Sequence, residues 1–141
     1  MTKKEYLQQA NQLNLRIESH IKDREEILDM MTCLSSIQNG ERVQSSPEQE
    51  ARFVRYLEEL TEIEEILESE IDMFVRLKKQ MNEVLSGISD AQCQMALRYK
   101  YVYGYTGESL MDKMHTSRRT LYRWINAGLE EMELPENPVI I

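Results

Sequence analysis

The chain has 141 residues, only five glycines and three prolines, and a formal net charge of −8. A chain of this length forms one domain, or one small domain with an extended element, and its abundance of Leu, Ile, Met, Glu, Gln and Arg predicts an all-α fold. No stretch holds the roughly 18 apolar residues of a membrane span, and the first residues lack the apolar core of a secretory signal.

The cysteines and histidines do not form a metal or redox motif. Cys33 and Cys93 lack paired spacing, so we expect free thiols in a reducing cytoplasm. His20 and His115 are not near either cysteine in sequence, which argues against a zinc site. The chain also has no recognisable nucleophile–base pair, phosphate-binding loop or Glu-x-x-His motif. The sequence therefore predicts a protein without cofactor, metal or enzymatic activity.

Charge is distributed unevenly along the chain. Residues 1–88 hold 11 Lys/Arg against 18 Asp/Glu. Residues 98–128 carry only two carboxylates and six cations, which are Arg98, Lys100, Lys113, Arg118, Arg119 and Arg123. Salt screens charges separated by more than about 8 Å at physiological ionic strength. A basic DNA-contacting surface is therefore compatible with an acidic protein.

Residues 1–88 have the heptad pattern of two long helices. In the first, apolar residues recur at Tyr6, Ala10, Leu13, Ile17, Ile27, Met31 and Leu34, with a parallel stripe at Leu7, Ile21 and Leu28. In the second they recur at Phe53, Leu57, Leu60, Leu67, Ile71, Phe74 and Met81, widened by Tyr56, Ile63, Ile66, Leu77 and Val84. We expect an antiparallel, coiled-coil-like hairpin, and the wide stripe predicts a further partner such as a second copy.

Polar residues mark the connection and the helix–helix seam. Ser35 to Ser46 separates the two patterns, and Ser46-Pro47-Glu48-Gln49 has the cap, first-turn proline and Gln of a helix start. His20 and Arg24 fall on the apolar seam, where they are expected to lie at its edge or to pair with glutamates across it. The glutamates of the second helix favour a solvated surface, with docking of a basic protein as the alternative.

Residues 89–134 have the pattern of three shorter helices, followed by a tail over 135–141. Ser89-Asp90-Ala91-Gln92 predicts a capped helix start; the helix runs to about Tyr103, with Gly104 at its end, and its apolar surface comprises Met95, Leu97, Tyr99, Tyr101 and Val102. Thr106 is expected to cap a short helix with Glu108 in its first turn. The inward-facing residues of that helix are Leu110, Met111 and Met114.

His115-Thr116 forms the predicted turn before the last helix. Ser117 caps the helix that follows, while Gly128 is expected to weaken its end. Three- and four-residue spacing puts Leu121, Trp124, Ile125 and Leu129 on one face and leaves Arg118, Arg119, Tyr122, Arg123 and Asn126 exposed on the other.

This arrangement is typical of a helix-turn-helix that binds DNA. A helix N-terminus has free N–H groups and a partial positive charge, so it binds phosphate, and arginines beside it contact groove edges. Ser117 would cap its helix in any protein, and exposed arginines are often only solvated. The candidate DNA-binding residues are Thr116, Ser117, Arg118, Arg119, Tyr122, Arg123 and Asn126.

Residues 89–132 resemble the region-four helix-turn-helix of bacterial sigma factors, in particular the version found in phage and prophage transcription regulators of the RinA/ArpU kind. The run Ser117-Arg118-Arg119-Thr120-Leu121-Tyr122-Arg123 carries the specific part of the similarity. The rest is the general pattern of three helices, carried by Leu97-Arg98-Tyr99, Tyr101 to Thr106, Glu108, Leu110 and Met114. The whole chain resembles small phage-encoded proteins of uncharacterised function. The resemblance implies binding of double-stranded DNA through the helix from Ser117, and control of phage gene expression. Where the turn of the motif usually has glycine this chain has His115, so a left-handed backbone is expected there.

Two heptad helices joined to such a module lead us to expect a homodimer formed by the N-terminal helices. Two alternatives remain open at the level of sequence. One is an adaptor whose acidic helices bind RNA polymerase or another phage protein. The other is the small subunit of a packaging terminase, which also joins a helix-turn-helix to helices that oligomerise.

Overall fold

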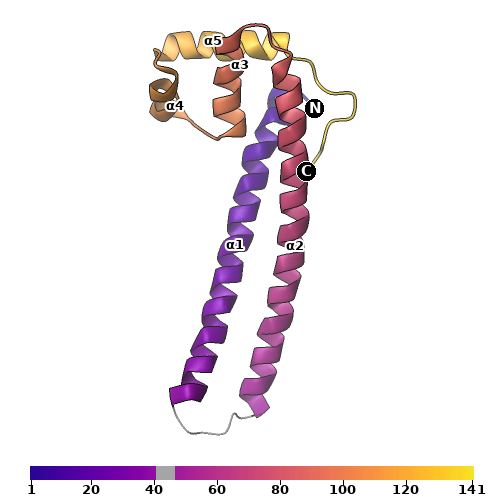
Figure 1. The fold of residues 1–141 in the computed structure, drawn as a ribbon, viewed down its shortest axis with the longest axis vertical. Coiled ribbons are helices and arrows are strands. Elements are labelled where there is room, and N and C mark those ends of the chain that lie inside the picture. Colours follow the sequence, from indigo (N-terminus) through magenta and orange to yellow (C-terminus); the bar gives the residue numbers. More distant parts are fainter. Residues whose placement is uncertain (41–46) are drawn as a thin grey trace. The chain divides into compact units, whose positions relative to one another are not determined.

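The protein is all-helical, as predicted. The computed structural model describes the backbone of residues 1–40 and 47–141, with side chains for 1–34 and 47–141. The elements are α1 (Lys3–Gly40), α2 (Pro47–Ser86), α3 (Ala91–Leu97), the π-helix η1 (Arg98–Val102), α4 (Gly107–Met114) and α5 (Arg118–Glu131) (Figure 1). Within these described ranges, no helix is both long and apolar enough to cross a membrane.

Contacts between residues divide the chain into two compact units. We call Leu15–Asp72 the hairpin unit; the terminal unit combines Met1–Asn14 with Met73–Ile141. Both long helices therefore contribute to both units. The start of α1 and the end of α2 belong to the terminal unit, together with the short C-terminal helices. Each unit is described separately below.

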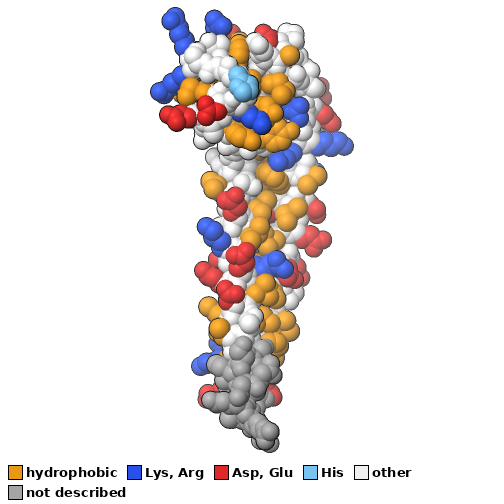
Figure 2. All heavy atoms as spheres, turned by 60° about the vertical axis from the view of Figure 1, so that its left-hand side comes forward, with side chains coloured by type: hydrophobic (Ala, Val, Ile, Leu, Met, Phe, Trp, Pro, Cys, Tyr) orange, Lys and Arg blue, Asp and Glu red, His pale blue; other side chains and the backbone are white. Residues whose placement is uncertain are grey.

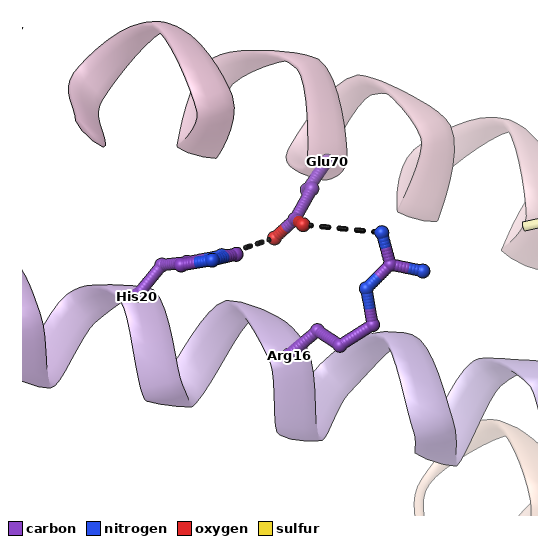
Figure 3. A network of polar contacts seen from close by, with 3 residues as sticks. All are labelled: Arg16, His20 and Glu70. Atoms are coloured by element: carbon purple, nitrogen blue, oxygen red, sulfur yellow. Dashed lines mark hydrogen bonds and ion pairs between the residues drawn. The ribbon is translucent and has the colours of Figure 1, made fainter. Parts of the chain in front are cut away.

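The hairpin unit consists of antiparallel segments of α1 and α2 joined by ion pairs. Arg24 Nε lies 3.3 Å from Glu64 Oε1. Further along, Arg16 Nη2 lies 3.3 Å from Glu70 Oε1, and His20 Nδ1 lies 2.9 Å from Glu70 Oε2 (Figure 3). As residue numbers fall along α1 they rise along α2, so the two segments are antiparallel. The prediction that His20 and Arg24 pair with glutamates across the seam is confirmed.

Burial in the hairpin unit is limited to a narrow seam. Ile17, Ile27 and Leu67 are buried between the helices. The part of the second α1 stripe that lies in this unit is incompletely covered, because Ile21 and Leu28 are each 36% exposed, whereas Leu7 of the same stripe is buried in the terminal unit.

A two-helix unit buries one narrow face per helix. On α2 the exposed side chains of the predicted stripe are Leu57 and Ile71, which were predicted in its main part, and Ile66, whereas Tyr56 and Ile63, predicted to widen the stripe, are half-buried.

The ends of the long helices differ in part from the prediction. The expected connection begins at Ser35, whereas α1 continues to Gly40. The second helix begins at Pro47, as predicted, with Glu48 and Glu50 in its first turn, where the helix dipole favours carboxylates. The predicted cap Ser46 lies outside the described residues.

The terminal unit has the better-developed core. The side chains that are fully buried there include Tyr6 and Leu7 from α1, Leu77 and Met81 from α2, and Leu97 from α3. The start of α1 and the end of α2 thus pack with the C-terminal helices around common apolar residues. This packing places the first residues of α1 in the same compact body as α5.

Two glutamines hold the C-terminal tail against this core. Gln80 Nε2 donates to the Asn137 carbonyl at 2.8 Å, and Gln80 Oε1 accepts from Val139 N–H at 2.9 Å. Gln9 Nε2 donates to the Val139 carbonyl at 2.8 Å, and its oxygen accepts from Ile141 N–H at 3.1 Å. In all four bonds a glutamine side chain contacts a backbone atom of the tail. Because backbone atoms are the same for every residue type, the sequence pattern of the tail did not predict these bonds.

The start of α3 corrects one predicted cap. Asp90 occupies the N-cap, and its Oδ1 accepts from Gln92 N–H at 2.9 Å and from Cys93 N–H at 3.5 Å. Ser89 N–H instead donates to Glu131 Oε1 at 2.8 Å. Hydrogen bonds from Ser89 lower the pKa of the Glu131 carboxyl. The residue expected to cap α3 therefore ties its start to the end of α5.

The predicted helix to Tyr103 is not regular throughout. Its last turn is η1, where Tyr103 N–H donates to the carbonyl of Arg98 at 3.1 Å. Gly104 follows with φ +80°, a left-handed conformation that glycine adopts without strain. Met95, expected in the apolar surface, is 37% exposed, whereas Tyr101 is buried. The three- and four-residue rule does not anticipate the wider turn of η1, although the buried residues Tyr101 and Val102 within it were both predicted to be part of the apolar surface.

Candidate nucleic-acid interface

A tight turn joins α4 to α5. His115 has φ 51° and ψ 48°, so the predicted left-handed backbone is confirmed. Its N–H donates to the Asp112 carbonyl at 3.3 Å, and Thr116 N–H donates to the Met111 carbonyl at 3.2 Å. These bonds close α4 in the manner of a left-handed C-cap. Met111, expected inside, is only half-buried, while Leu110 is buried.

The start of α4 differs from its predicted capping. Thr106 stands at the N-cap position, but its hydroxyl accepts no capping bond. Ser109 Oγ instead donates to the Thr106 carbonyl at 2.6 Å. Glu108 lies in the first turn, as predicted, where the helix dipole favours it.

Ser117 caps α5, as predicted. Its Oγ accepts from Thr120 N–H at 3.3 Å and donates to Thr120 Oγ1 at 3.1 Å. The Ser117 carbonyl accepts the next helical bond, from Leu121 N–H at 3.0 Å. In a helix the N–H groups of the first two residues, here Arg118 and Arg119, have no intrahelical acceptor. The start of α5 thus offers backbone donors to an anion.

The two faces of α5 divide as predicted. Leu121 and Ile125 are buried, while Trp124 and Leu129 are half-buried on the same side. The opposite side is exposed along its whole length; we call it the α5 face, which consists of Arg118, Arg119, Tyr122, Arg123 and Asn126. The preceding Ser117 is exposed and Thr116 is half-buried. The structure therefore brings all seven predicted DNA-binding residues to the start and one side of α5.

Gly128 has a different role from the expected one. It is buried and helical rather than a point of weakness. A Cβ at this position would lie 2.7 Å from Leu97 Cδ1 and 3.4 Å from the Cys93 carbonyl oxygen. Glycine is thus what allows α3 and α5 to approach closely. This contact fixes the packed side of α5 and, with it, the direction of the α5 face.

Additional cations surround the α5 face. The Arg118 guanidinium carbon lies 5.6 Å from the centre of the Tyr122 ring. A hydrogen bond from Arg118 and its charge lower the pKa of the Tyr122 hydroxyl, and the charges of Lys100 and Lys4 act in the same direction. Lys100 lies in η1 and Lys4 at the start of α1. Sequence spacing did not identify Lys4, because only the folded terminal unit brings it near α5.

A groove opens beside the start of α5. It has a volume of about 450 Å³, with Leu110, Leu121 and Ile125 as its apolar wall. Lys100, Arg118 and Tyr122 also line it. The groove thus combines an apolar surface with two of the cations that act on Tyr122.

The arginines of the α5 face are not neutralised by the protein itself. Across residues 1–34 and 47–141, the ion pairs with carboxylates all lie in the hairpin unit, and none involves Arg118, Arg119 or Arg123. Figure 2 shows both Lys or Arg side chains and carboxylates over the short C-terminal helices as well as along the long helices. The cations of the α5 face therefore remain available to an external anion.

Other cations of residues 98–128 contact aromatic rings. The Lys113 Nζ lies 5.6 Å from the ring centre of Tyr99 and 5.9 Å from that of Tyr105. Arg98 Nη2 donates to the Tyr103 hydroxyl at 3.4 Å. Arg98 and Lys113 thus contact tyrosines outside the α5 face, whereas Arg118 contacts Tyr122 within it.

Comparison with known proteins identifies one family. The family model described as "Protein of unknown function (DUF1492)" matches residues 39–133, a range that includes α2 and all the short C-terminal helices. No curated protein and no solved structure matches. Across the described side chains, no group of three or more His, Cys, Asp or Glu residues is arranged to hold a metal ion.

Proposed function

The chain belongs to the DUF1492 family, whose description assigns no activity, and we propose that it is a non-enzymatic, sequence-specific DNA-binding regulator of transcription. The observation that carries the proposal is the α5 face. Three exposed arginines stand at the start of a capped helix, and no carboxylate of the described residues pairs with them. Such a helix fits the major groove of B-DNA.

The geometry suggests a division of labour along α5. The free N–H groups at its start, with Ser117 and Arg118, suit phosphate oxygens. Tyr122, Arg123 and Asn126 follow on the same exposed side, where side chains can contact base edges or a thymine methyl group. Lys4 and Lys100 add positive charge beside this helix. Phosphate contacts would position the protein, and the later residues of α5 would supply sequence preference.

A single helix-turn-helix binds weakly, so the proposal includes a homodimer formed by the long helices. Two modules held at a fixed spacing gain affinity through effective concentration and contact paired half-sites. The resemblance to phage regulators adds control of phage genes in the cytoplasm, with RNA polymerase as a further partner. The acidic hairpin unit would limit non-specific DNA binding, because that binding is mostly phosphate electrostatics.

Selection of bound fragments from random double-stranded DNA at a stated salt concentration tests this proposal. We expect the protein to enrich a paired motif, and Arg118→Ala/Arg119→Ala to lose the enrichment. The matched control is Arg52→Ala/Arg55→Ala, which removes the same charge from two exposed positions on α2. If only the charge of the whole chain matters, both variants will behave alike.

Other outcomes would point to the alternatives. If no fragment is enriched at any salt concentration, the proposal fails and an adaptor that binds another protein through its acidic helices becomes the better account. A ring-sized assembly in light scattering would favour a terminase subunit over a dimeric regulator. Circular dichroism of each variant should show unchanged helix content, because the substituted arginines are exposed.

A further inference from the structure

The groove beside the start of α5 has an apolar wall that packing holds in place. The groove lies between η1, the start of α4 and α5, and its wall is formed by Leu110, Leu121 and Ile125. All three residues also belong to the buried core of the terminal unit. The volume of about 450 Å³ is within the range of roughly 300–1,000 Å³ found for small-molecule sites. We call this cavity the α5 groove.

Two cations from different elements line the α5 groove. Lys100 comes from η1, and its Nζ lies 5.3 Å from the centre of the buried Tyr101 ring. Arg118 is the first residue of α5, and its guanidinium carbon lies 5.6 Å from the centre of the Tyr122 ring. A hydrogen bond from Arg118 and the charge of Arg118 lower the pKa of the Tyr122 hydroxyl. The charges of Lys100 and Lys4 lower this pKa further, so several cations act on the same part of the groove.

The carboxylates near the α5 groove do not cancel this positive charge. Glu108 also lines the groove, but across residues 1–34 and 47–141 it forms no ion pair with a cation. Asp112, one turn further along α4, is exposed and is not among the lining residues. The lining side chains therefore carry two positive charges and one negative charge. Lys100 and Arg118 repel a cationic occupant and attract an anionic one.

We propose that the α5 groove binds a small organic anion, which is a molecule with an apolar body and one carboxylate or phosphate group. The apolar body packs on Leu110, Leu121 and Ile125, where it is removed from water. The anionic group is bound by Lys100 and Arg118, because hydrogen bonds between opposite charges are the strong ones. A phosphate of the DNA backbone matches only the cations and leaves the apolar wall uncovered, so the groove has a ligand of its own.

Arg118 belongs to both the α5 groove and the α5 face. An anion bound in the groove occupies this guanidinium and adds negative charge where a DNA phosphate is expected. The ligand and DNA therefore weaken each other's binding, and by the same factor, because coupling between two binding equilibria is reciprocal. This consequence rests on the proposed function, whereas the binding of the small anion does not.

The first experiment is an NMR titration without DNA, with phenylpropionate as the probe and the methyl signals of Leu110, Leu121 and Ile125 as the readout. We expect saturable shifts with a dissociation constant of about 1 mM or tighter for a probe of this size. Phenylpropanol and phenylpropylammonium have the same apolar body without the negative charge, and we expect each to bind roughly 10-fold more weakly or worse. The exposed Leu57 and Ile71 on α2 report non-specific apolar binding.

Lys100→Ala and Lys113→Ala form a matched pair of variants. Each removes one lysine charge from the terminal unit, but Lys113 lies against the rings of Tyr99 and Tyr105 and does not line the α5 groove. We expect Lys100→Ala to weaken phenylpropionate binding by roughly 10-fold, because it removes a charged hydrogen-bond donor. Lys113→Ala is expected to change it by less than about twofold, since salt screens the more distant charge.

Three results of this first experiment would each overturn the proposal. They are no shift of the groove signals, equal affinity for the three probes, and equal weakening by the two variants. If phenylpropionate does not bind but a peptide of residues 57–72 shifts the groove signals, the α5 groove binds the acidic helix of a second copy instead, and the proposal also fails. Circular dichroism of each variant separates a lost site from unfolding.

The second experiment measures DNA affinity by fluorescence anisotropy at constant ionic strength. We expect phenylpropionate to weaken DNA binding by up to roughly 10-fold at a concentration about ten times its dissociation constant. Acetate at the same concentration is the control, because it has the charge without the apolar body. Unchanged DNA affinity with a saturated groove would contradict the coupling through Arg118. If the protein binds no DNA at all, the proposed function fails, while the first experiment still decides whether the groove binds an anion.

Discussion

Single residues with buried polar groups determine how α1 and α2 align with each other. The Glu70 carboxylate is nearly buried and contacts both Arg16 and His20. Buried ion pairs add little net stability, because removing the charges from water offsets their attraction. Their clearest consequence here is alignment, since a shift of α2 by one turn would separate Glu70 from both partners. We therefore regard this contact as a determinant of hairpin register.

Tyr6 makes the terminal unit sensitive to high pH. Its side chain is fully buried, and its hydroxyl donates to Gln80 Oε1 at 2.7 Å. Burial, together with the charge of Glu83, raises the pKa of Tyr6 from 10.0 to about 12. Between these values the unfolded chain loses a proton that the folded protein keeps, so stability is full below pH 10.0 and falls as pH rises toward about 12.

The measurement is urea unfolding at several pH values from 9 to 11.5, roughly the range over which a shifted tyrosine titrates. The free energy of unfolding is expected to fall by about 2 kcal/mol more in the unsubstituted protein than in Tyr6→Phe. The variant also loses the Gln80 bond and will be less stable at neutral pH. Equal pH slopes for the two proteins would show that Tyr6 does not keep its proton on folding.

The conformation of several residues was predicted correctly from the sequence because it depends only on neighbouring residues. Ser117 caps α5 and His115 takes a left-handed turn, and both follow from the residues on either side. Gln9 and Lys4 were not predicted, because their partners lie at the opposite end of the chain. Ser89 was assigned a cap that the adjacent Asp90 provides, since both residue types accept the same bonds.

At the scale of elements, the direction of the α5 face depends on the contact between α3 and α5. Gly128→Ala would place a methyl group 2.7 Å from Leu97 Cδ1. Leu97 is fully buried and has little room to move, so we expect an overpacking cost of about 1–3 kcal/mol, partly offset by the roughly 1 kcal/mol higher helix propensity of alanine.

Thermal or urea unfolding of Gly128→Ala checks this expectation, with the exposed Ala127→Gly as a comparison of propensity alone. We expect both variants to be less stable, but for different reasons. Adding Leu97→Ala to Gly128→Ala should reduce the additional cost, since the clashing side chain is removed. A Gly128→Ala protein more stable than the unsubstituted one would mean that α3 and α5 are not closely packed there.

Helical periodicity predicted the all-α class and the starts of α2 and α5, because amphipathic spacing and caps are strong signals. It did not predict η1, since a π-turn changes the spacing within what otherwise resembles a regular helix. It also did not predict the extension of α1 to Gly40, where polar residues were expected to form a connection. Composition distinguishes polar from apolar segments better than it distinguishes helix ends.

At the scale of the whole molecule, acidic and basic surfaces should respond to salt in opposite ways. The hairpin unit carries 16 Asp/Glu against six Lys/Arg, so two copies repel each other at low salt. The α5 face is basic and binds a polyanion in the proposed function. Added salt should therefore strengthen self-association while it weakens DNA binding. The distribution of charge in the fold, rather than the net charge of −8, governs both processes.

The most direct test of the central claim is the salt dependence of DNA affinity, measured by fluorescence anisotropy on a selected fragment. The logarithm of the association constant should fall linearly with the logarithm of salt concentration, with a slope of about −0.9 for each phosphate contacted. Arg118→Ala should make that slope less steep by about 0.9 if Arg118 contacts a phosphate. Binding with an unchanged slope in Arg118→Ala, Arg119→Ala and Arg123→Ala, or no binding at low salt, would contradict DNA recognition by the α5 face.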